Sequence, residues 1–149
     1  MTQNSSWWQD RHLLLAFLLA CSYWILLAWL QPPETRWLWP LSKPLEFLLP
    51  VLIYPILEEI VFRGLLQGEI NNHLRNCQIG ILSCANLLTS VIFTALHFIH
   101  HPPLWAIAVF IPSLIFGYFK DRTGHLGAPI ALHVFYNGGY FLIFTHQGA

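Results

Sequence analysis

Two adjacent glutamates and an arginine stand inside one of the most apolar parts of the chain, in the stretch PILEEIVFRG. Glu59 and Arg63 are four residues apart, so on a helix they share a face in the order that favours an ion pair. Glu58 is rotated by about 100° from Glu59 and has no cation at helical spacing. A carboxylate with few competing partners suits a general base acting on water. The alternative is an ion-pair network that only locks helices together, and this is the better account of Glu59 with Arg63.

A second apolar stretch, FTALH, places Phe93 and His97 one helical turn apart. His97 taken alone is weak evidence of a function, because a histidine there can equally be a hydrogen-bonded packing residue. His97 and His101 are four residues apart and could bind a metal from one helix face. Pro102 directly follows His101 and disfavours regular helix there, so we rank this metal pair low.

A third stretch, HVFYN, places His133 and Asn137 one turn apart on one helix face. Both side chains can donate hydrogen bonds, and two donors converging in a low-dielectric site are what a developing oxyanion needs. Interhelical hydrogen bonding, worth about 0.6 kcal/mol on average in a bilayer, would explain this pair by itself. Three separate stretches carry such groups, however, and one shared interior cavity explains all of them at once.

The composition shows which elements must position these residues. The chain has 149 residues, of which 56% are hydrophobic and only 9% are charged, against roughly 25% charged in a typical soluble domain. A helix needs about 20 apolar residues to span a bilayer, and three runs without a charged residue are long enough. These runs are His12 to Pro33, Asn76 to Phe119, and Thr123 to the C-terminus. Seven acidic and seven basic residues cancel, which argues against nucleic acid as a partner.

We therefore predict an all-α protein, a polytopic bundle of about five transmembrane helices around an intramembrane polar cavity. Residues 1–149 are expected to form a single integral membrane domain. Pro50 and Pro55 should kink or delay the second span, and the polar stretch QGEINNHLRN should link it to the third. The spans are predicted at about Leu13–Leu30, Leu45–Leu66, Ile79–Ile99, Leu104–Phe119 and Ala128–Phe144.

The three cysteines, Cys21, Cys77 and Cys84, are odd in number and lack metal-ligand spacing. We interpret them as core residues and expect no disulfide framework. The segment LLAC could end a cleaved signal with a lipid-accepting Cys21. The apolar run continues to Leu30, which favours a retained transmembrane helix.

The distribution of lysine and arginine predicts the orientation in the membrane. With five crossings and Arg63 left aside, four basic residues lie on the side of the N-terminus and two on the other side. The positive-inside rule then places the N-terminus in the cytoplasm and the C-terminus outside, in what we expect to be the cytoplasmic membrane of a prokaryote. The four are Arg11, Arg75, Lys120 and Arg122, and the two are Arg36 and Lys43.

Taken in order, the three motifs resemble a known family. EEIVFR fits E-E-x-x-x-R, FTALH fits F-x-x-x-H and HVFYN fits H-x-x-x-N. This set is similar to that of the CPBP (CAAX protease and bacteriocin-processing) intramembrane proteases, also called the Abi or type II CAAX-prenyl-endopeptidase family. The stretch FGYFKDRTGHLGAPIALHVFYN resembles the family's last conserved block. The similarity covers about Leu45 to Tyr140, which would be the catalytic core.

The resemblance implies an all-helical membrane endopeptidase of the glutamic type. Glu58 and His97 would activate the attacking water, and His133 and Asn137 would stabilise the tetrahedral oxyanion. Glu59 and Arg63 would support the site structurally. This chain is shorter than many relatives, which leaves the substrate open, and nothing in it reads a prenyl group. The expected substrate is a membrane-anchored protein or peptide, such as a sorting tail or a leader.

The resemblance leaves a metal open as an alternative. The chain has no H-E-x-x-H motif, so a metal would have to be held by Glu58, His97 and His133. That set is acceptable for zinc by ligand type. We favour hydrolysis without a metal or other cofactor.

Two other classes of function fit parts of the pattern. A non-enzymatic membrane adaptor or immunity protein could use the same scaffold, but it has no need of a carboxylate beside two histidines. A proton or ion carrier would also contain intramembrane glutamate and histidine. A carrier usually needs a relay that reaches both faces, whereas the titratable residues here gather at one level.

Overall fold

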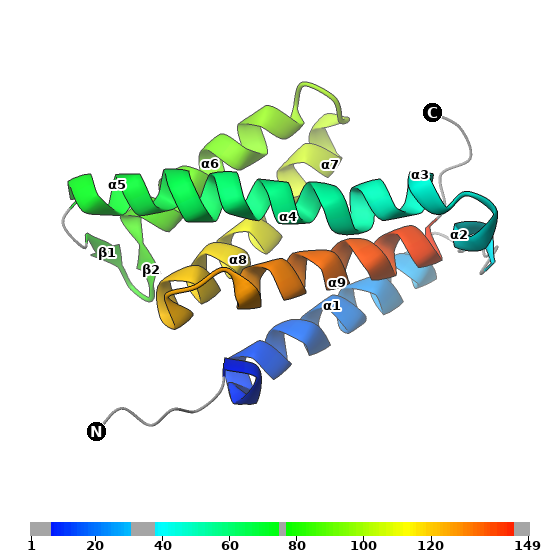
Figure 1. The fold of residues 1–149 in the computed structure, drawn as a ribbon, viewed down its shortest axis with the longest axis horizontal. Helices are drawn as coiled ribbons and strands as arrows, with labels where there is room; N and C mark the ends of the chain where they lie inside the picture. The colour runs from blue at the N-terminus through cyan, green and yellow to red at the C-terminus, as the bar shows by residue number, and fades with distance from the viewer. Residues whose placement is uncertain (1–6, 31–37, 75–76, 145–149) are drawn as a thin grey trace. The chain divides into compact units, whose positions relative to one another are not determined.

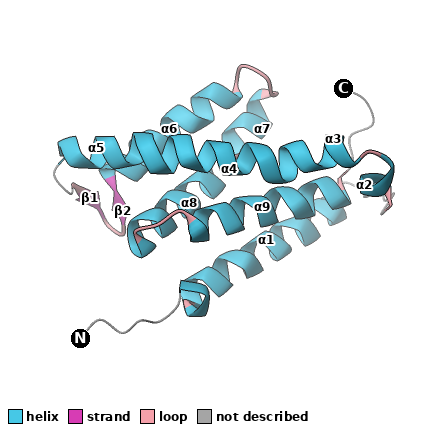
Figure 2. Ribbon diagram, in the orientation of Figure 1, coloured by secondary structure: helices cyan, strands magenta, loops and turns pink. Residues whose placement is uncertain are grey.

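The computed structural model describes residues 7–30, 38–74 and 77–144. Those residues are mostly helical, with one small β-hairpin (Figures 1 and 2). The chain divides into two compact units. The terminal unit comprises residues 1–56 and 131–149, and the central unit comprises residues 57–130.

In the terminal unit a long N-terminal helix packs against the C-terminal helix. The N-terminal helix α1 (Arg11–Leu30) follows a short turn, η1 (Trp7–Gln9), and α9 (Gly127–Ile143) enters this unit at residue 131. The ring centroid of Phe135 lies 4.7 Å from that of Phe17 and 4.9 Å from that of Trp24. A Cβ atom built on Gly139 would lie 2.1 Å from the Trp24 ring, so this glycine permits the close approach. The predicted first and last spans are confirmed as helices, each within two residues of its predicted ends.

The predicted second span begins in the terminal unit with several short helical segments. These are α2 (Trp39–Ser42), α3 (Pro44–Leu48), the π-helical segment η2 (Leu49–Ile53) and α4 (Tyr54–Glu58). Pro50 lies in η2, where the wider turn accommodates a residue without an N–H group. The irregularity predicted at Pro50 is therefore a π-helical turn, whereas Pro55 lies in the α-helical segment α4.

In the central unit the helical segments continue beyond the predicted end of the second span. The π-helical segment η3 (Glu59–Leu66) is followed by α5 (Gln67–Leu74). The polar stretch QGEINNHLRN, which was expected to follow the second span, is therefore helical as far as Leu74. Gln67, at the start of α5, is buried, and its side-chain amide donates hydrogen bonds to α8. These bonds favour continuation of the helix beyond the apolar stretch.

A two-stranded hairpin starts the predicted third span. Strands β1 (Gln78–Ile79) and β2 (Leu82–Ser83) pair antiparallel, and Gly80 supplies the positive φ of 64° that the tight turn needs. The helix α6 (Cys84–His97) starts only after Ser83, whose hydroxyl accepts a hydrogen bond from the Asn86 N–H at 2.9 Å. The prediction of a span starting at Ile79 was wrong, because apolar composition alone does not separate a short strand from a helix.

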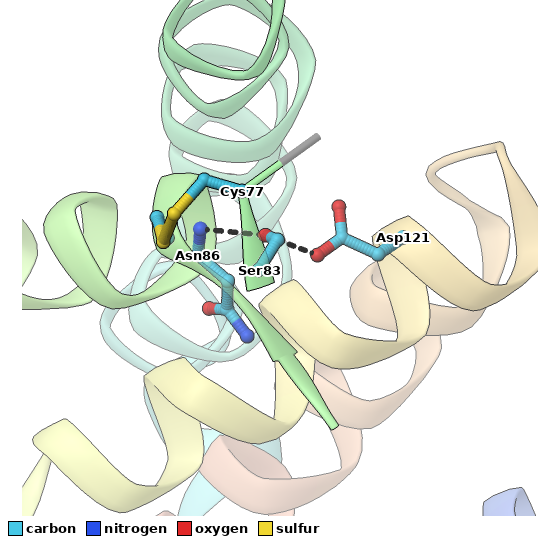
Figure 3. Close-up of a disulfide and its surroundings, with 5 residues drawn as sticks. Cys77, Ser83, Asn86 and Asp121 are labelled. Carbon is cyan, nitrogen blue, oxygen red and sulfur yellow. Dashed lines mark hydrogen bonds between the residues drawn. A yellow bond between two sulfur atoms is a disulfide. The ribbon is translucent and has the colours of Figure 1, made fainter. Parts of the chain in front are cut away.

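The hairpin also brings two cysteines together. Cys77 and Cys84 form a disulfide (Figure 3). The Cys84 N–H also donates to the Cys77 carbonyl at 2.9 Å. Our interpretation of these two cysteines as core residues was wrong, because the strand register places them opposite one another. Cys21 is a free cysteine in α1.

The remaining helices of the central unit are α7 (Pro103–Ala108) and α8 (Phe110–Thr123). Within the described residues, two helices are long and apolar enough to cross a membrane: Arg11–Leu30, which is α1, and Pro103–Thr123, which comprises α7 and α8. Helix α6 is apolar but shorter. Many large apolar side chains face outward, including Trp29 and Leu104, as expected for surfaces in contact with lipid. The number of spans stays a prediction.

Candidate active site

The ion pair expected from the sequence is present in the central unit. Glu59 and Arg63 are both fully buried, and the Arg63 Nε atom lies 3.5 Å from a carboxylate oxygen of Glu59. The Arg63 Nη2 group also donates to the carbonyl of Ser113 at 3.0 Å and to its hydroxyl at 2.8 Å. Glu58, one position earlier, is only partly buried. The pair is thus enclosed within the central unit, whereas the Glu58 side chain is partly accessible.

Two sets of contacts show how α6 lies against this segment. A Cβ atom built on Gly117 would lie within 3 Å of both Gln67 and Asn86, so these two residues are neighbours. Further along, the Arg63 guanidinium lies over the ring of Phe93, 5.2 Å from its centroid. From the first contact to the second, the residue numbers decrease from Gln67 to Arg63 on one segment and increase from Asn86 to Phe93 on α6. The two helical segments are therefore antiparallel.

This antiparallel packing places His97 at the level of the glutamates. His97 follows Phe93 by one turn, and the glutamates precede Phe62 and Arg63 by one turn. Phe62 packs edge-on against Phe93, with ring centroids 4.9 Å apart. The structure therefore brings the Glu58 and His97 positions to the same level of the central unit.

The hydrogen bond of His97 defines what its ring can do. The Nδ1 atom lies 2.8 Å from the carbonyl oxygen of Phe93. A carbonyl can only accept, so Nδ1 carries the hydrogen and the neutral ring keeps a lone pair on Nε2. That nitrogen can act as a base or as a metal ligand.

The His97 ring is part of a row of aromatic rings at the end of α6. Its centroid is 4.4 Å from that of Phe93, 5.7 Å from that of His101 and 5.9 Å from that of Trp105. The two histidine rings are nearly parallel, at 22°, so their in-plane lone pairs do not converge on one ion. Burial lowers the pKa of His101, and the nearby His97 and His100 lower it further, which favours an uncharged ring in this stack.

The other two predicted residues lie on α9, in the terminal unit. His133 is buried, and the Asn137 side-chain amide donates to the Pro50 carbonyl at 2.8 Å. In η2 the Tyr54 N–H bonds to the Leu49 carbonyl, and the next residue, Pro55, has no N–H to offer Pro50. Asn137 therefore satisfies a carbonyl that the π-helical turn leaves without its backbone donor.

The candidate residues thus fall into two groups. Glu58, Glu59, Arg63 and His97 belong to the central unit, and His133 and Asn137 belong to the terminal unit. A zinc set of Glu58, His97 and His133 fits by ligand type. Among the described residues, no three potential ligands are grouped closely enough to hold a metal ion. The zinc set remains a prediction that involves both units.

A comparison with known protein families identifies the family of this chain. Residues 39–139 match the family model described as type II CAAX prenyl endopeptidase Rce1-like, which covers more than half of the chain. The chain belongs to the Rce1-like family. The match includes all six candidate residues and agrees with the resemblance seen in the motifs. No curated protein sequence and no solved structure matches the chain.

The Rce1-like family is a family of membrane-integral proteases, so this chain is placed among enzymes that hydrolyse peptide bonds in a membrane setting. Sequence reasoning missed several residues that hold the site's helices together. Gln67 continues the face of Glu59 and Arg63 at four-residue spacing, a signal that could have been read. Ser113, Gly117 and Asp121 repeat at the same spacing on α8 and receive the bonds of that face.

Proposed function

We propose that this Rce1-like protein is an intramembrane endopeptidase that cleaves a membrane-anchored protein or peptide with a water activated by Glu58 and His97. The observation that carries the proposal is the hydrogen bond from His97 Nδ1 to the Phe93 carbonyl. It fixes the orientation of the His97 ring on α6, the helix that packs against the segment directly following Glu58. The protease family supplies the class of reaction.

The reaction proceeds by addition and elimination. Glu58, assisted by His97, removes a proton from water as the water oxygen attacks the carbonyl carbon of the scissile bond. The carbonyl oxygen becomes negative and accepts hydrogen bonds from His133 and Asn137. The proton then passes to the amide nitrogen as the carbon–nitrogen bond breaks, which releases a carboxylic acid and an amine. Glu59 and Arg63 hold the helix that carries Glu58.

We favour hydrolysis without a metal. Glu58, His97 and His133 are the residues that would hold zinc in the alternative, where the ion would polarise the substrate carbonyl. The protein would act in the lipid bilayer of a prokaryotic cytoplasmic membrane, on a sorting tail, a leader or a similar anchored segment.

Reconstitution into lipid vesicles with candidate membrane-anchored peptides tests the proposal. The wild-type protein should cleave, with and without a chelator, and Glu58→Gln should lower the rate by at least about hundredfold, since it removes the base. Glu69→Gln is the matched control, because Glu69 is an exposed glutamate of the following helix. Cleavage by Glu58→Gln at the wild-type rate would remove this mechanism, and loss of activity on chelation would establish the zinc alternative.

A further inference from the structure

A buried row of polar side chains joins three helical segments of the central unit. Gln67 donates to the Gly117 carbonyl at 3.0 Å and to Asp121 at 2.8 Å. Asn86 donates to the Leu114 carbonyl at 2.9 Å. We call this row the polar seam, and Asp121 closes its exposed end. Its members are Arg63, Gln67, Ser83, Asn86, Ser90, Ser113 and Asp121.

Ser113 is the member of the seam that holds the arginine. It is fully buried on α8, and both its carbonyl and its hydroxyl accept hydrogen bonds from the same Arg63 nitrogen, at 3.0 and 2.8 Å. Bonds from a charged donor are stronger than those between neutral groups. Because the guanidinium is planar and rigid, fixing Nη2 also fixes the plane of the whole group.

Phe93 contacts both Arg63 and His97 and so links the positions of these two side chains. The guanidinium carbon lies 5.2 Å from the Phe93 ring centroid, within the range of a cation–π contact. The same phenylalanine packs its ring 4.4 Å from the His97 ring and accepts the Nδ1 hydrogen bond on its carbonyl. Phe93 is almost fully buried, so it has little room to adjust independently.

We propose that Ser113 is a positioning residue for the hydrolysis, acting through Arg63 and Phe93 on the orientation of the His97 ring. This inference rests on the proposed function. Ser113 is fully buried and contacts Arg63, so we expect it to act on the arrangement of the reacting groups and not on substrate binding. Its removal should therefore lower kcat and leave KM unchanged.

The test compares two buried serines of the same seam. Ser113→Ala removes one acceptor from Arg63, whereas Ser90→Ala removes only the donor to the Asn86 amide oxygen, at 3.1 Å. Both serines are fully buried, so the two changes are matched in chemistry and in burial. We expect kcat to fall about tenfold or more in Ser113→Ala, because small misplacements of a reacting group are costly. Ser90→Ala should stay within about twofold of the wild type, and Ser113→Thr, which keeps the hydroxyl, should recover most of the rate.

A second readout does not require proteolysis. The side-chain nitrogen signals of His97, measured by NMR in micelles, should shift in Ser113→Ala and stay in place in Ser90→Ala. Equal kcat values in the two alanine variants, or a Ser113→Thr protein as slow as Ser113→Ala, would overturn the proposal. An unchanged His97 spectrum in Ser113→Ala would do the same. If the wild type shows no Glu58-dependent cleavage, the proposed function fails while the His97 spectrum still tests the link from Ser113.

Discussion

At the scale of single residues, the chain solves the problem of placing an arginine in an apolar interior. Arg63 has no exposed surface, and its guanidinium is surrounded by Glu59, Ser113 and the ring of Phe93. A charge buried without such partners would cost several kcal/mol. The loss of one partner would therefore lower the free energy of unfolding, because it would leave the other charge buried without its partner. The pair also fixes the residues that flank it.

The cost of breaking the pair can be measured with Glu59→Gln. The substitution keeps the shape of the side chain and removes its charge, so Arg63 stays buried without its ion-pair partner at 3.5 Å. We expect the free energy of unfolding in micelles to fall by about 3 kcal/mol or more.

Glu46→Gln is the control for this loss of charge. Glu46 pairs with Lys43 at 2.8 Å, but both side chains are more than half exposed. Removing an exposed pair should cost less than about 1 kcal/mol. Equal losses in the two variants would mean that the buried pair contributes no more than a surface one.

At the scale of helices, α6 and α8 approach closely because one position has no side chain. A Cβ atom at Gly117 would lie 1.9 Å from the Asn86 amide oxygen and 2.9 Å from that of Gln67. The helices can therefore share the polar seam only while residue 117 is glycine. Small residues allow the same close approach in membrane helices generally.

Gly117→Ala should consequently destabilise the protein by about 1–3 kcal/mol, since the new methyl group overpacks a buried contact. Combining it with Asn86→Ala makes room for the methyl group, so the loss in the double variant should be smaller than the sum of the single losses. Unfolding of the four proteins in micelles measures this coupling.

Gly68→Ala is the matched control, because a Cβ atom there meets nothing within 4 Å. Alanine is the better helix former, so this change should be neutral or slightly stabilising. Additive losses for Gly117→Ala and Asn86→Ala would show that the two residues do not compete for the same space.

At the scale of the whole molecule, the disulfide bears on the orientation in the membrane. Ser83 donates to Asp121 at 2.6 Å, so the hairpin lies at the same end of the central unit as the C-terminus of α8 (Figure 3). The cysteine pair therefore shares a side with Lys120 and Arg122. The count of basic residues places that side in the cytoplasm, whereas disulfides persist on the oxidising side of a membrane.

We expect the orientation that the disulfide indicates, with the hairpin on the oxidising side of the membrane, because the margin of basic residues is only four to two. In cells expressing a Cys21→Ser background, an impermeant maleimide should label the protein only after treatment with an impermeant reductant. That result would place the hairpin on the external side of the membrane. Labelling by a permeant maleimide alone, without reductant, would show cytoplasmic thiols and restore the orientation expected from the charges.

The sequence by itself determined what depends on neighbours along one helix and on composition. The pairing of Glu59 with Arg63 and the alignment of Phe93 with His97 follow from a spacing of four residues. The membrane class follows from the apolar runs, and the family follows from motifs that are local in the chain.

Only the tertiary structure showed which helix faces meet. Ser113 lies 50 residues from Arg63 in the sequence, and its four-residue spacing with Gly117 and Asp121 marks a helix face without showing which helix that face meets. The pairing of Cys77 with Cys84 required a two-residue turn in a stretch whose apolar composition suits a helix equally well. Contacts of this kind depend on how close two backbones can approach, and that is decided by the residues on both elements together.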